Sequence, residues 1–224
     1  MIEFDRVSFS YPQRPVLREV SLSLSEKRIG IIGGNGSGKS TLARLVNGLV
    51  VPTRGTVAVN GHDTRRDLDR VRRTVGFVFQ DPDLQIIMPT VAEDLAFSLR
   101  PLKLPKAEVA RLVEAQLDRH GLLAHRDHPA HLLSGGQKQL LAIASVLITG
   151  PSVLVMDEPT TLLDLRNRRA VMRLVEGLPQ QVLLVTHDLE TLEGFDRVVV
   201  IDDGRVVADA SPAEAIGAYR ALVG

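Results

Sequence analysis

Leu133-Ser134-Gly135-Gly136-Gln137 is the stretch of this sequence that decides the fold, because two other motifs accompany it in a fixed order. Gly33-Gly34-Asn35-Gly36-Ser37-Gly38-Lys39-Ser40 lies upstream and fits the phosphate-loop pattern G-x-x-x-x-G-K-[ST]. Val153-Leu154-Val155-Met156-Asp157-Glu158 lies downstream and is an apolar run that ends in two acids. A phosphate loop alone indicates only that a nucleoside triphosphate binds, whereas the three motifs together are far more specific.

The composition is that of an ordinary globular protein. The 224 residues suffice for one large domain, or for one domain with a subdomain. Basic and acidic residues balance at 27 each, so the net charge gives no reason to expect a nucleic-acid partner. Cysteine is absent, which excludes disulfides and thiolate metal sites. We expect no membrane span and no signal peptide, because no apolar run approaches about 20 residues and the chain starts with a strand-like pattern.

Hydrophobic periodicity predicts an α/β core that is interrupted by helices. Strands are expected at residues 2–9, 20–24, 28–32, 56–60 and 75–79, and a helix at 41–49 behind the phosphate loop. From 82 to about 150 the pattern is helical, with helices at 106–120 and 137–148. Strands then return at 153–156, 182–186 and 197–201, between helices at 165–176 and 190–195. We therefore predict one domain over 1–224, with its core at about 1–80 and 151–224 and a helical subdomain at about 81–150.

The phosphate loop has a direct chemical interpretation. Glycines at 33, 34, 36 and 38 allow backbone N–H groups to turn toward a phosphate, and the following helix directs its positive dipole end at the same anion. Lys39 would reach the β- and γ-phosphates, and the Ser40 hydroxyl would coordinate Mg²⁺.

The two acids at 157 and 158 predict separate roles. Asp157 ends a buried strand, where a carboxylate is costly unless it serves a cation, so we expect it to hold Mg²⁺ through water. Glu158 points elsewhere and could polarise the attacking water. In the middle motif, Ser134 is expected to cap a helix, and Gly135 and Gly136 would let a phosphate approach closely.

The three motifs together resemble those of the ATPase subunits of ATP-binding cassette (ABC) proteins, over nearly the whole chain. The resemblance implies an ABC nucleotide-binding domain: a P-loop NTPase core with a parallel or mixed sheet and an inserted α-helical subdomain. It also implies ATP hydrolysis with Mg²⁺. In this family two subunits close head to tail on ATP, so that one supplies the phosphate loop and the other the signature motif. The chain is therefore expected to form a dimer, either with itself or with a paralogue.

The resemblance assigns roles to single residues. Gln80 matches the Q-loop glutamine, which contacts Mg²⁺ and the attacking water; His187 matches the switch histidine that holds the γ-phosphate; Tyr11 matches the aromatic residue that stacks on adenine. The implied catalytic set is Glu158, His187 and Gln80, and the implied metal set is Ser40, Gln80 and Asp157. The implied nucleotide-binding set is Tyr11, Gly33, Asn35, Gly36, Gly38, Lys39, Ser40, Thr41, Ser134, Gly135, Gly136 and Gln137.

Two other segments draw attention. Thr160-Thr161-Leu162-Leu163-Asp164 departs from the family pattern, because bulky leucines replace the usual small residues before Asp164. His125, His128 and His131 are spaced by three, but Pro129 interrupts any helix that would align them, so we expect a solvated loop there and not a metal site.

The residues after Gln80 are similar to those of the ATPases of energy-coupling factor (ECF) transporters, with Gln85 matching a second glutamine of that type. This resemblance implies that residues 80–97, from Gln80 to Phe97, receive the transmembrane coupling protein, with an acidic rim of Asp81, Asp83, Glu93 and Asp94. A substrate-binding membrane protein would be an indirect partner, and the location would be peripheral, at the cytoplasmic face of the inner membrane. The short end after the last strand and the variant loop are most similar to the biotin-transporter branch, with cobalt or nickel uptake as the alternative.

Three other classes are weighed against this one. DNA-repair ABC ATPases insert a long coiled coil between the Q-loop and the signature, for which the interval between Gln80 and Ser134 has no room. ABC ATPases that act on ribosomes carry two cassettes in one chain. A small-molecule P-loop kinase would lack the signature motif, and a conventional ABC transporter ATPase remains the nearest alternative.

Overall fold

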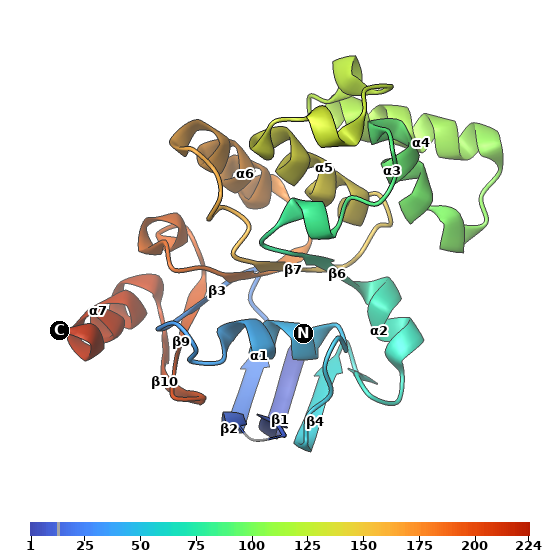
Figure 1. The fold of residues 1–224 in the computed structure, drawn as a ribbon. Coiled ribbons are helices and arrows are strands. Elements are labelled where there is room, and N and C mark those ends of the chain that lie inside the picture. Colours follow the sequence, from blue (N-terminus) through green and yellow to red (C-terminus); the bar gives the residue numbers. More distant parts are fainter. Residues whose placement is uncertain (13) are drawn as a thin grey trace. The chain divides into compact units, whose positions relative to one another are not determined.

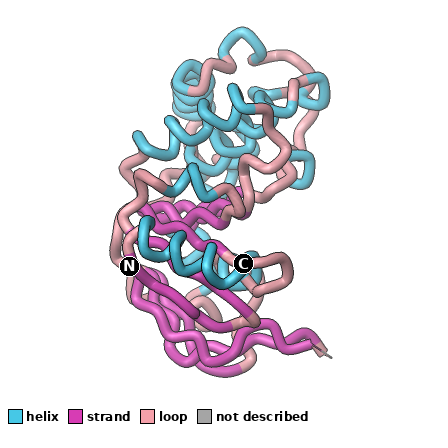
Figure 2. Tube along the Cα trace, turned by 90° about the vertical axis from the view of Figure 1, so that its left-hand side faces the viewer, coloured by secondary structure: helices cyan, strands magenta, loops and turns pink. Residues whose placement is uncertain are grey.

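The chain folds into two compact units in a computed structural model that describes residues 1–12 and 14–224 (Figure 1). Unit 1 comprises Met1–Phe77, Ser152–Glu158 and Leu178–Gly224, and unit 2 comprises Val78–Pro151 and Pro159–Gly177. In Figure 2 the long strands belong to unit 1, which also contains helices, whereas helices and loops build unit 2. The segments of each unit are discontinuous in sequence, as in a core with an inserted subdomain.

Unit 1 contains two sheets. The first has the order β2-β1-β4-β5 and is antiparallel, with strands β1 (Ile2–Tyr11), β2 (Arg14–Leu24), β4 (Arg54–Val59) and β5 (His62–Asp63). The second has the order β10-β9-β3-β8-β7-β6. Its strands are β3 (Arg28–Ile32), β6 (Val75–Val78), β7 (Val153–Asp157), β8 (Gln181–Val185), β9 (Arg197–Asp202) and β10 (Arg205–Ala210).

The second sheet has a parallel centre. Strand β3 pairs in parallel with β8 and β9, and β7 pairs in parallel with β8, while β10 is antiparallel to β9. Every residue of β3 and β7 is buried, as expected for strands that are covered on both faces. Helix α1 (Lys39–Val46) contacts β4 of the first sheet and β7 and β8 of the second. This mixed sheet with a helix directly after the phosphate loop confirms the predicted α/β class.

Unit 2 contains four helices, of which the first three pack around one apolar core and the fourth packs on the third. They are α3 (Val91–Ser98), α4 (Lys106–Arg119), α5 (Gly135–Leu147) and α6 (Leu165–Gly177). Short 3-10 helices η1 (Pro82–Leu84), η2 (Arg100–Leu102), η3 (Leu123–His125) and η4 (Ala130–Leu132) connect them. Helix α3 contacts both α4 and α5. The core consists of Val91, Leu95, Leu99, Val113, Leu117, Leu122, Ala130, Leu133, Leu141 and Ala144.

Residues 159–177 belong to unit 2, although the sequence pattern assigns them to the core. The physical reason is that α6 packs against α5, the signature helix. The segment between β7 and β8 therefore leaves unit 1 and returns to it, which an alternation of strand and helix in the sequence does not reveal.

Three further elements escape the sequence pattern. Helix α2 (Leu68–Thr74) buries only Val71 and has four charged residues among its seven, so it has almost no apolar stripe. After β10, helix α7 (Pro212–Val223) packs on β9 and β10, and the sequence pattern predicts no helix there. The helix predicted at 190–195 is the shorter 3-10 helix η5 (Leu189–Leu192).

A buried histidine makes the stability of unit 2 depend on pH. His120 is the C-cap residue of α4, and its Nδ1 lies 2.9 Å from the carbonyl oxygen of Gln116, to which it donates a hydrogen bond. Burial lowers the pKa of His120 below the ordinary imidazole value of 6.5; the bond to Gln116 opposes this shift and the charge of Arg119 reinforces it. The unfolded chain therefore binds a proton that the folded chain does not take up until lower pH, so the stabilising contribution is lost as pH falls below about 6.5.

We expect the free energy of unfolding of the wild type to fall more steeply between pH 7.5 and 5.5 than that of a His120→Gln variant. The difference in slope should be at most about 1.4 kcal/mol per pH unit, the linkage of one proton. Urea unfolding at a series of pH values measures it. Parallel pH profiles for the two proteins would show that His120 does not carry this dependence.

Candidate functional site

The phosphate loop of unit 1 joins β3 to α1 with a conformation that requires glycine at position 38. Gly38 has φ 109°, and a Cβ atom there would lie 2.8 Å from Leu17 Cδ2 and 3.0 Å from the carbonyl oxygen of Val16. Lys39 is buried at the start of α1. Its Nζ donates to the carbonyl oxygens of Gly33 and Gly34, both at 2.9 Å. The ammonium group is thus held over the loop where a phosphate would bind.

Burial perturbs the lysine and the acid on the two sides of this loop in opposite senses. Burial lowers the pKa of Lys39, although the charges of Glu158 and Asp157 raise it. Burial also raises the pKa of Asp157, against the hydrogen bond from Ser40 and the charges of Arg44 and Lys39. Burial therefore disfavours the charged form of both side chains. A polyanion that carries a divalent cation would bring a negative charge to Lys39 and a positive charge to Asp157.

Ser40 and Asp157 form the corner where a metal would fit. Ser40 Oγ donates to Asp157 Oδ1 at 2.8 Å, and Arg44 lies 3.7 Å from Asp157 Oδ2. A hydroxyl and a carboxylate at this separation match the all-oxygen ligands that Mg²⁺ prefers, with phosphate and water completing the shell. Gln80, the third residue of the predicted metal set, lies in unit 2 after β6, so its distance from this corner stays a prediction.

Glu158 turns away from Asp157 toward the switch histidine. His187 Nδ1 lies 2.7 Å from Glu158 Oε2, so the Nδ1–H group of the ring donates a hydrogen bond to the carboxylate. Glu158 adopts φ 54°, a left-handed conformation that is uncommon outside glycine, while its N–H donates to the carbonyl oxygen of Val185 at 2.9 Å. Such backbone strain concentrates at functional sites, where the surrounding structure holds it in place.

A cavity of about 190 Å³ opens beside the loop. It is lined by Tyr11, Arg14, Val16, Gly36, Gly38, Lys39, Ser40 and Thr41. The Tyr11 ring is partly exposed and packs edge-on against Phe9, with ring centroids 5.0 Å apart, which leaves a face available for stacking. Asn35 is exposed on the same loop. Arg14 was missed by sequence reasoning; the only signal was a basic residue soon after Tyr11 in the β1–β2 hairpin.

The signature motif starts α5 in unit 2. Ser134 and Gln137 form a capping box: the Ser134 N–H donates to Gln137 Oε1 at 2.9 Å, and the Gln137 N–H donates to Ser134 Oγ at 3.4 Å. A Cβ atom at Gly135 would meet open space, whereas one at Gly136 would overlap the side-chain amide of Asn167 in α6. Gly136 therefore permits the close packing of α5 on Asn167, whereas Gly135 faces open space.

The segment after Gln80 is tied to the signature helix. Gln85 follows η1, where its Oε1 accepts from the Phe79 N–H at 3.3 Å and its Nε2 donates to the carbonyl oxygen of Ala142 in α5, also at 3.3 Å. Gln85 thus links the backbone beside Gln80 to α5. The large apolar side chains of Leu84 and Ile87, 75% and 68% exposed, leave an uncovered surface nearby.

The predicted acidic rim of this segment is wrong for Asp94, whereas Asp83 and Glu93 are exposed and Asp81 is half-buried. Asp94 lies in the interior, where it accepts hydrogen bonds from the Ile87 and Met88 N–H groups and from Ser145 Oγ. Asp83 pairs with Lys138 at 2.7 Å. The remaining two acids cap helices: Asp81 accepts from the N–H of Asp83 at the start of η1, and Glu93 bonds to Thr90 at the start of α3.

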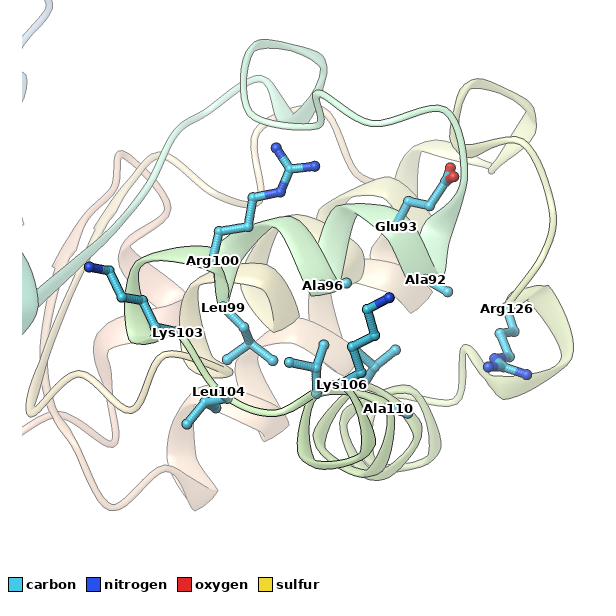
Figure 3. Close-up of a pocket in the computed structure, with 12 residues that line it drawn as sticks. Ala92, Glu93, Ala96, Leu99, Arg100, Lys103, Leu104, Lys106, Ala110 and Arg126 are labelled. Atoms are coloured by element: carbon cyan, nitrogen blue, oxygen red, sulfur yellow. The ribbon is translucent and has the colours of Figure 1, made fainter.

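A pocket of about 650 Å³ lies between α3 and α4 (Figure 3). Its wall is apolar, with Ala92, Ala96, Leu99, Leu104, Val109, Ala110 and Val113. Its charged residues are four basic side chains and one acid: Arg100, Lys103, Lys106, Arg126 and Glu93. The Arg100 guanidinium stacks 4.7 Å from the centroid of the Phe97 ring. This volume and this lining are typical of a binding pocket.

The variant loop after Glu158 ends in a helix cap. Asp164 Oδ1 accepts from the Asn167 N–H at 2.8 Å, and the Leu163 N–H donates to the carbonyl oxygen of Thr160 at 3.1 Å. Leu162 is 64% exposed. The bulky substitutions therefore add an apolar side chain to the surface of unit 2 without disturbing the Asp164 cap.

Comparison with known sequences identifies the family. Residues 17–161 match the family model described as ABC transporter. A Deinococcus radiodurans protein, named among the ABC transporter ATP-binding proteins, is 58% identical over 98% of this chain and 97% of its own length. The biotin transport ATP-binding protein of Rhizobium etli is 50% identical over 99% of this chain and 98% of that protein. An energy-coupling factor transporter ATP-binding protein of Caldanaerobacter subterraneus subsp. tengcongensis is 43% identical over 96% and 82%.

Comparison with solved structures agrees. An ATP-binding cassette solved as a dimer in a post-hydrolysis state, bound to ADP and Pi, matches with a TM-score of 0.83 and 28% sequence identity, over 95% of this chain and 99% of that one. The resemblance noted from the motifs is thus confirmed along the whole chain, and not only at the motifs. The chain belongs to the ABC transporter family and is an ATPase of that family.

Proposed function

We propose that this chain is the ATP-hydrolysing subunit of an energy-coupling factor importer, and that biotin is its substrate. The observation that carries the ATPase part is the convergence of Lys39, Asp157, Glu158 and His187 within unit 1. The ECF type is supported by relatives that carry that name, and the biotin assignment by the Rhizobium etli relative. Cobalt or nickel is the alternative substrate.

In the proposed mechanism, Glu158 accepts a proton from water while the water oxygen attacks the γ-phosphorus and the bond to the ADP oxygen breaks. His187 holds the Glu158 carboxylate through its Nδ1 proton. With that proton committed, His187 can also donate from Nε2 to a phosphate oxygen only as the imidazolium. Lys39 leaves the carbonyl oxygens of Gly33 and Gly34 and moves its charge to the β- and γ-phosphates.

Ser40 and Asp157 would hold Mg²⁺, which neutralises charge on the phosphates when bound. The two residues would orient the metal ion and balance its charge. When the ion binds, the Ser40 hydroxyl would exchange its hydrogen bond to Asp157 for the metal, and the Asp157 carboxylate would gain the metal as its counter-charge. Tyr11 would stack on the adenine at the mouth of the 190 Å³ cavity, where Arg14 adds a positive charge.

The signature motif completes the site from a second subunit in this proposal. Ser134 lies at the N-terminus of a helix of 13 residues, whose dipole favours an anion, and Gly135 leaves the approach open. Each chain carries one phosphate loop and one signature, so a head-to-tail pair forms two composite ATP sites. The dimeric solved relative supports this arrangement. The exposed Leu162 would lie on the contact surface.

Membrane attachment is proposed to occur through a partner. No helix within residues 1–12 and 14–224 is long and apolar enough to cross a bilayer. We place the docking surface for the transmembrane coupling protein on residues 80–97, where Leu84 and Ile87 are exposed and α3 forms one wall of the 650 Å³ pocket. The substrate-binding membrane protein is reached through that partner, at the cytoplasmic face of the inner membrane. Because four of the five charged residues that line the pocket are basic, acidic side chains of the partner are favoured at its edge.

Filling the pocket should release the membrane partner. Ala110 is an exposed pocket residue on α4, and Ala115 is an exposed residue on the same helix outside the pocket. We expect Ala110→Trp to lower co-purification of the coupling protein and ATP-dependent uptake of labelled biotin by about tenfold or more, since an indole would occupy the docking volume. Ala115→Trp is the matched control and should leave both unchanged.

The same assay separates the alternatives. Uptake of biotin, cobalt and nickel is compared in cells that carry the complete transporter, and ATP affinity is measured on the purified chain. Uptake of a metal but not of biotin would contradict the biotin assignment alone. An Ala110→Trp chain that still binds the coupling protein would place docking on another surface.

A further inference from the structure

Two histidines that the proposed mechanism does not use lie beside the signature motif: His125 contacts it through Gln137, and His128 contacts His125. His125 ends η3 and His128 follows in the next turn, both in unit 2. The Nδ1 atoms of the two rings lie 2.9 Å apart. The other nitrogen of His125, Nε2, lies 2.8 Å from Nε2 of Gln137, the residue that closes the capping box of Ser134.

The direction of these hydrogen bonds follows from one backbone donor. The Ser134 N–H can only donate, so the Gln137 atom that faces it at 2.9 Å must be the carbonyl oxygen Oε1. The Gln137 NH₂ group therefore faces His125, and His125 Nε2 must present a lone pair to it. A neutral imidazole with a bare Nε2 carries its proton on Nδ1, so His125 donates to His128 Nδ1 and His128 carries its own proton on Nε2.

We propose that His125 is a positioning residue for the ATPase reaction: as the neutral Nδ1–H tautomer, it fixes the Gln137 amide and thereby the Ser134 cap of the signature helix. The proposal rests on the proposed function, because the signature acts on ATP only in the head-to-tail dimer. His125 itself touches neither ATP nor any reacting atom. It acts by accepting a hydrogen bond from the Gln137 NH₂ group, which holds the Gln137 oxygen on the Ser134 N–H.

Replacing the acceptor should loosen the signature without affecting the phosphate loop. In His125→Leu the NH₂ group of Gln137 loses its hydrogen-bond acceptor, so the amide can rotate. The hydrogen bond from the Ser134 N–H to Gln137 Oε1 then weakens. Lys39 and its neighbours lie in unit 1, so nucleotide binding by a single subunit should not change. We expect kcat to fall about three- to tenfold, the range expected for one lost hydrogen bond, with little change in ATP affinity of the isolated subunit.

A conservative variant distinguishes positioning from packing. His125→Gln places a side-chain oxygen where Nε2 stood and should restore kcat to within about twofold of the wild type. His131→Leu removes an exposed histidine from the same loop and should leave kcat unchanged. Thermal unfolding of all variants shows whether each is folded. The kcat of Ser134→Ala shows separately whether the signature motif is needed for hydrolysis.

The tautomer can be measured in the wild-type full chain, which requires no variant to fold. Two-bond ¹H–¹⁵N spectra of the histidine rings should show His125 as Nδ1–H and His128 as Nε2–H, with His125→Gln used to assign the signals. Observation of His125 as Nε2–H would overturn the proposal. A wild-type kcat for His125→Leu, with a reduced kcat for the separate variant Ser134→Ala, would also overturn it. So would a kcat for His125→Gln that is no higher than that for His125→Leu. Full activity of Ser134→Ala would instead contradict the composite ATP site.

Discussion

Glu158→Gln should slow ATP hydrolysis by a factor on the order of 10² or more, because a positioned general base contributes about that much. The amide keeps the shape of the carboxylate, and its oxygen can still accept the Nδ1 proton of His187 at the observed position. The backbone bond from the residue 158 N–H to Val185 is also retained. ATP binding should therefore survive, and the variant should accumulate in the ATP-bound state.

The measurement is steady-state phosphate release alongside ATP affinity. Glu193→Gln, an exposed acid of unit 1 beyond η5, is the matched control and should hydrolyse ATP at the wild-type rate. An undiminished rate in Glu158→Gln would remove Glu158 from the mechanism. A simultaneous loss of ATP binding would mean that the Glu158 carboxylate contributes to the binding of ATP itself and not only to its hydrolysis.

The sequence predicts the centre of unit 1 well because burial there leaves a strong pattern. Strand β3 is predicted at its observed residues, and β7 with an error of one residue, since parallel strands that are covered on both faces are apolar runs without alternation. Helix α2 shows no such pattern, because only Val71 is buried and its charged side chains face solvent. The limits of unit 2 could not be found either, since α6 looks like any crossover helix until its packing on α5 is known.

The candidate site divides along the same line. The motif residues of unit 1 are brought together by β3, β7 and β8, whose carboxyl ends meet at one edge of the sheet. Asp94 was wrongly placed on the acidic rim because the sequence shows charges but not their partners: Asp94 is buried and accepts from Ser145, whereas Asp83 stays exposed and pairs with Lys138. Arg14 was missed because its place beside the phosphate loop depends on the β1–β2 hairpin.

The two halves of the proposed composite ATP site can each be damaged by a single substitution. Lys39→Ala removes the charge that faces the phosphates. Gly135→Asp adds a carboxylate to the signature where a Cβ atom meets open space, whereas position 136 is unsuitable because it would also displace Asn167. In a head-to-tail dimer, each variant alone damages both sites. A mixed dimer carries both lesions in one site and none in the other.

The most direct measurement is ATP-dependent dimer formation in a Glu158→Gln background, which prevents hydrolysis from dissolving the dimer. Each variant is tested by size exclusion with ATP, alone and in an equal mixture, with bound ATP counted per dimer. We expect Glu158→Gln alone to form dimers with about two ATP molecules, neither double variant to dimerise, and the mixture to yield dimers with about one ATP molecule. Dimers formed equally well by either double variant alone, or a mixture that stays monomeric at concentrations where the parent dimerises, would contradict a site shared between two subunits.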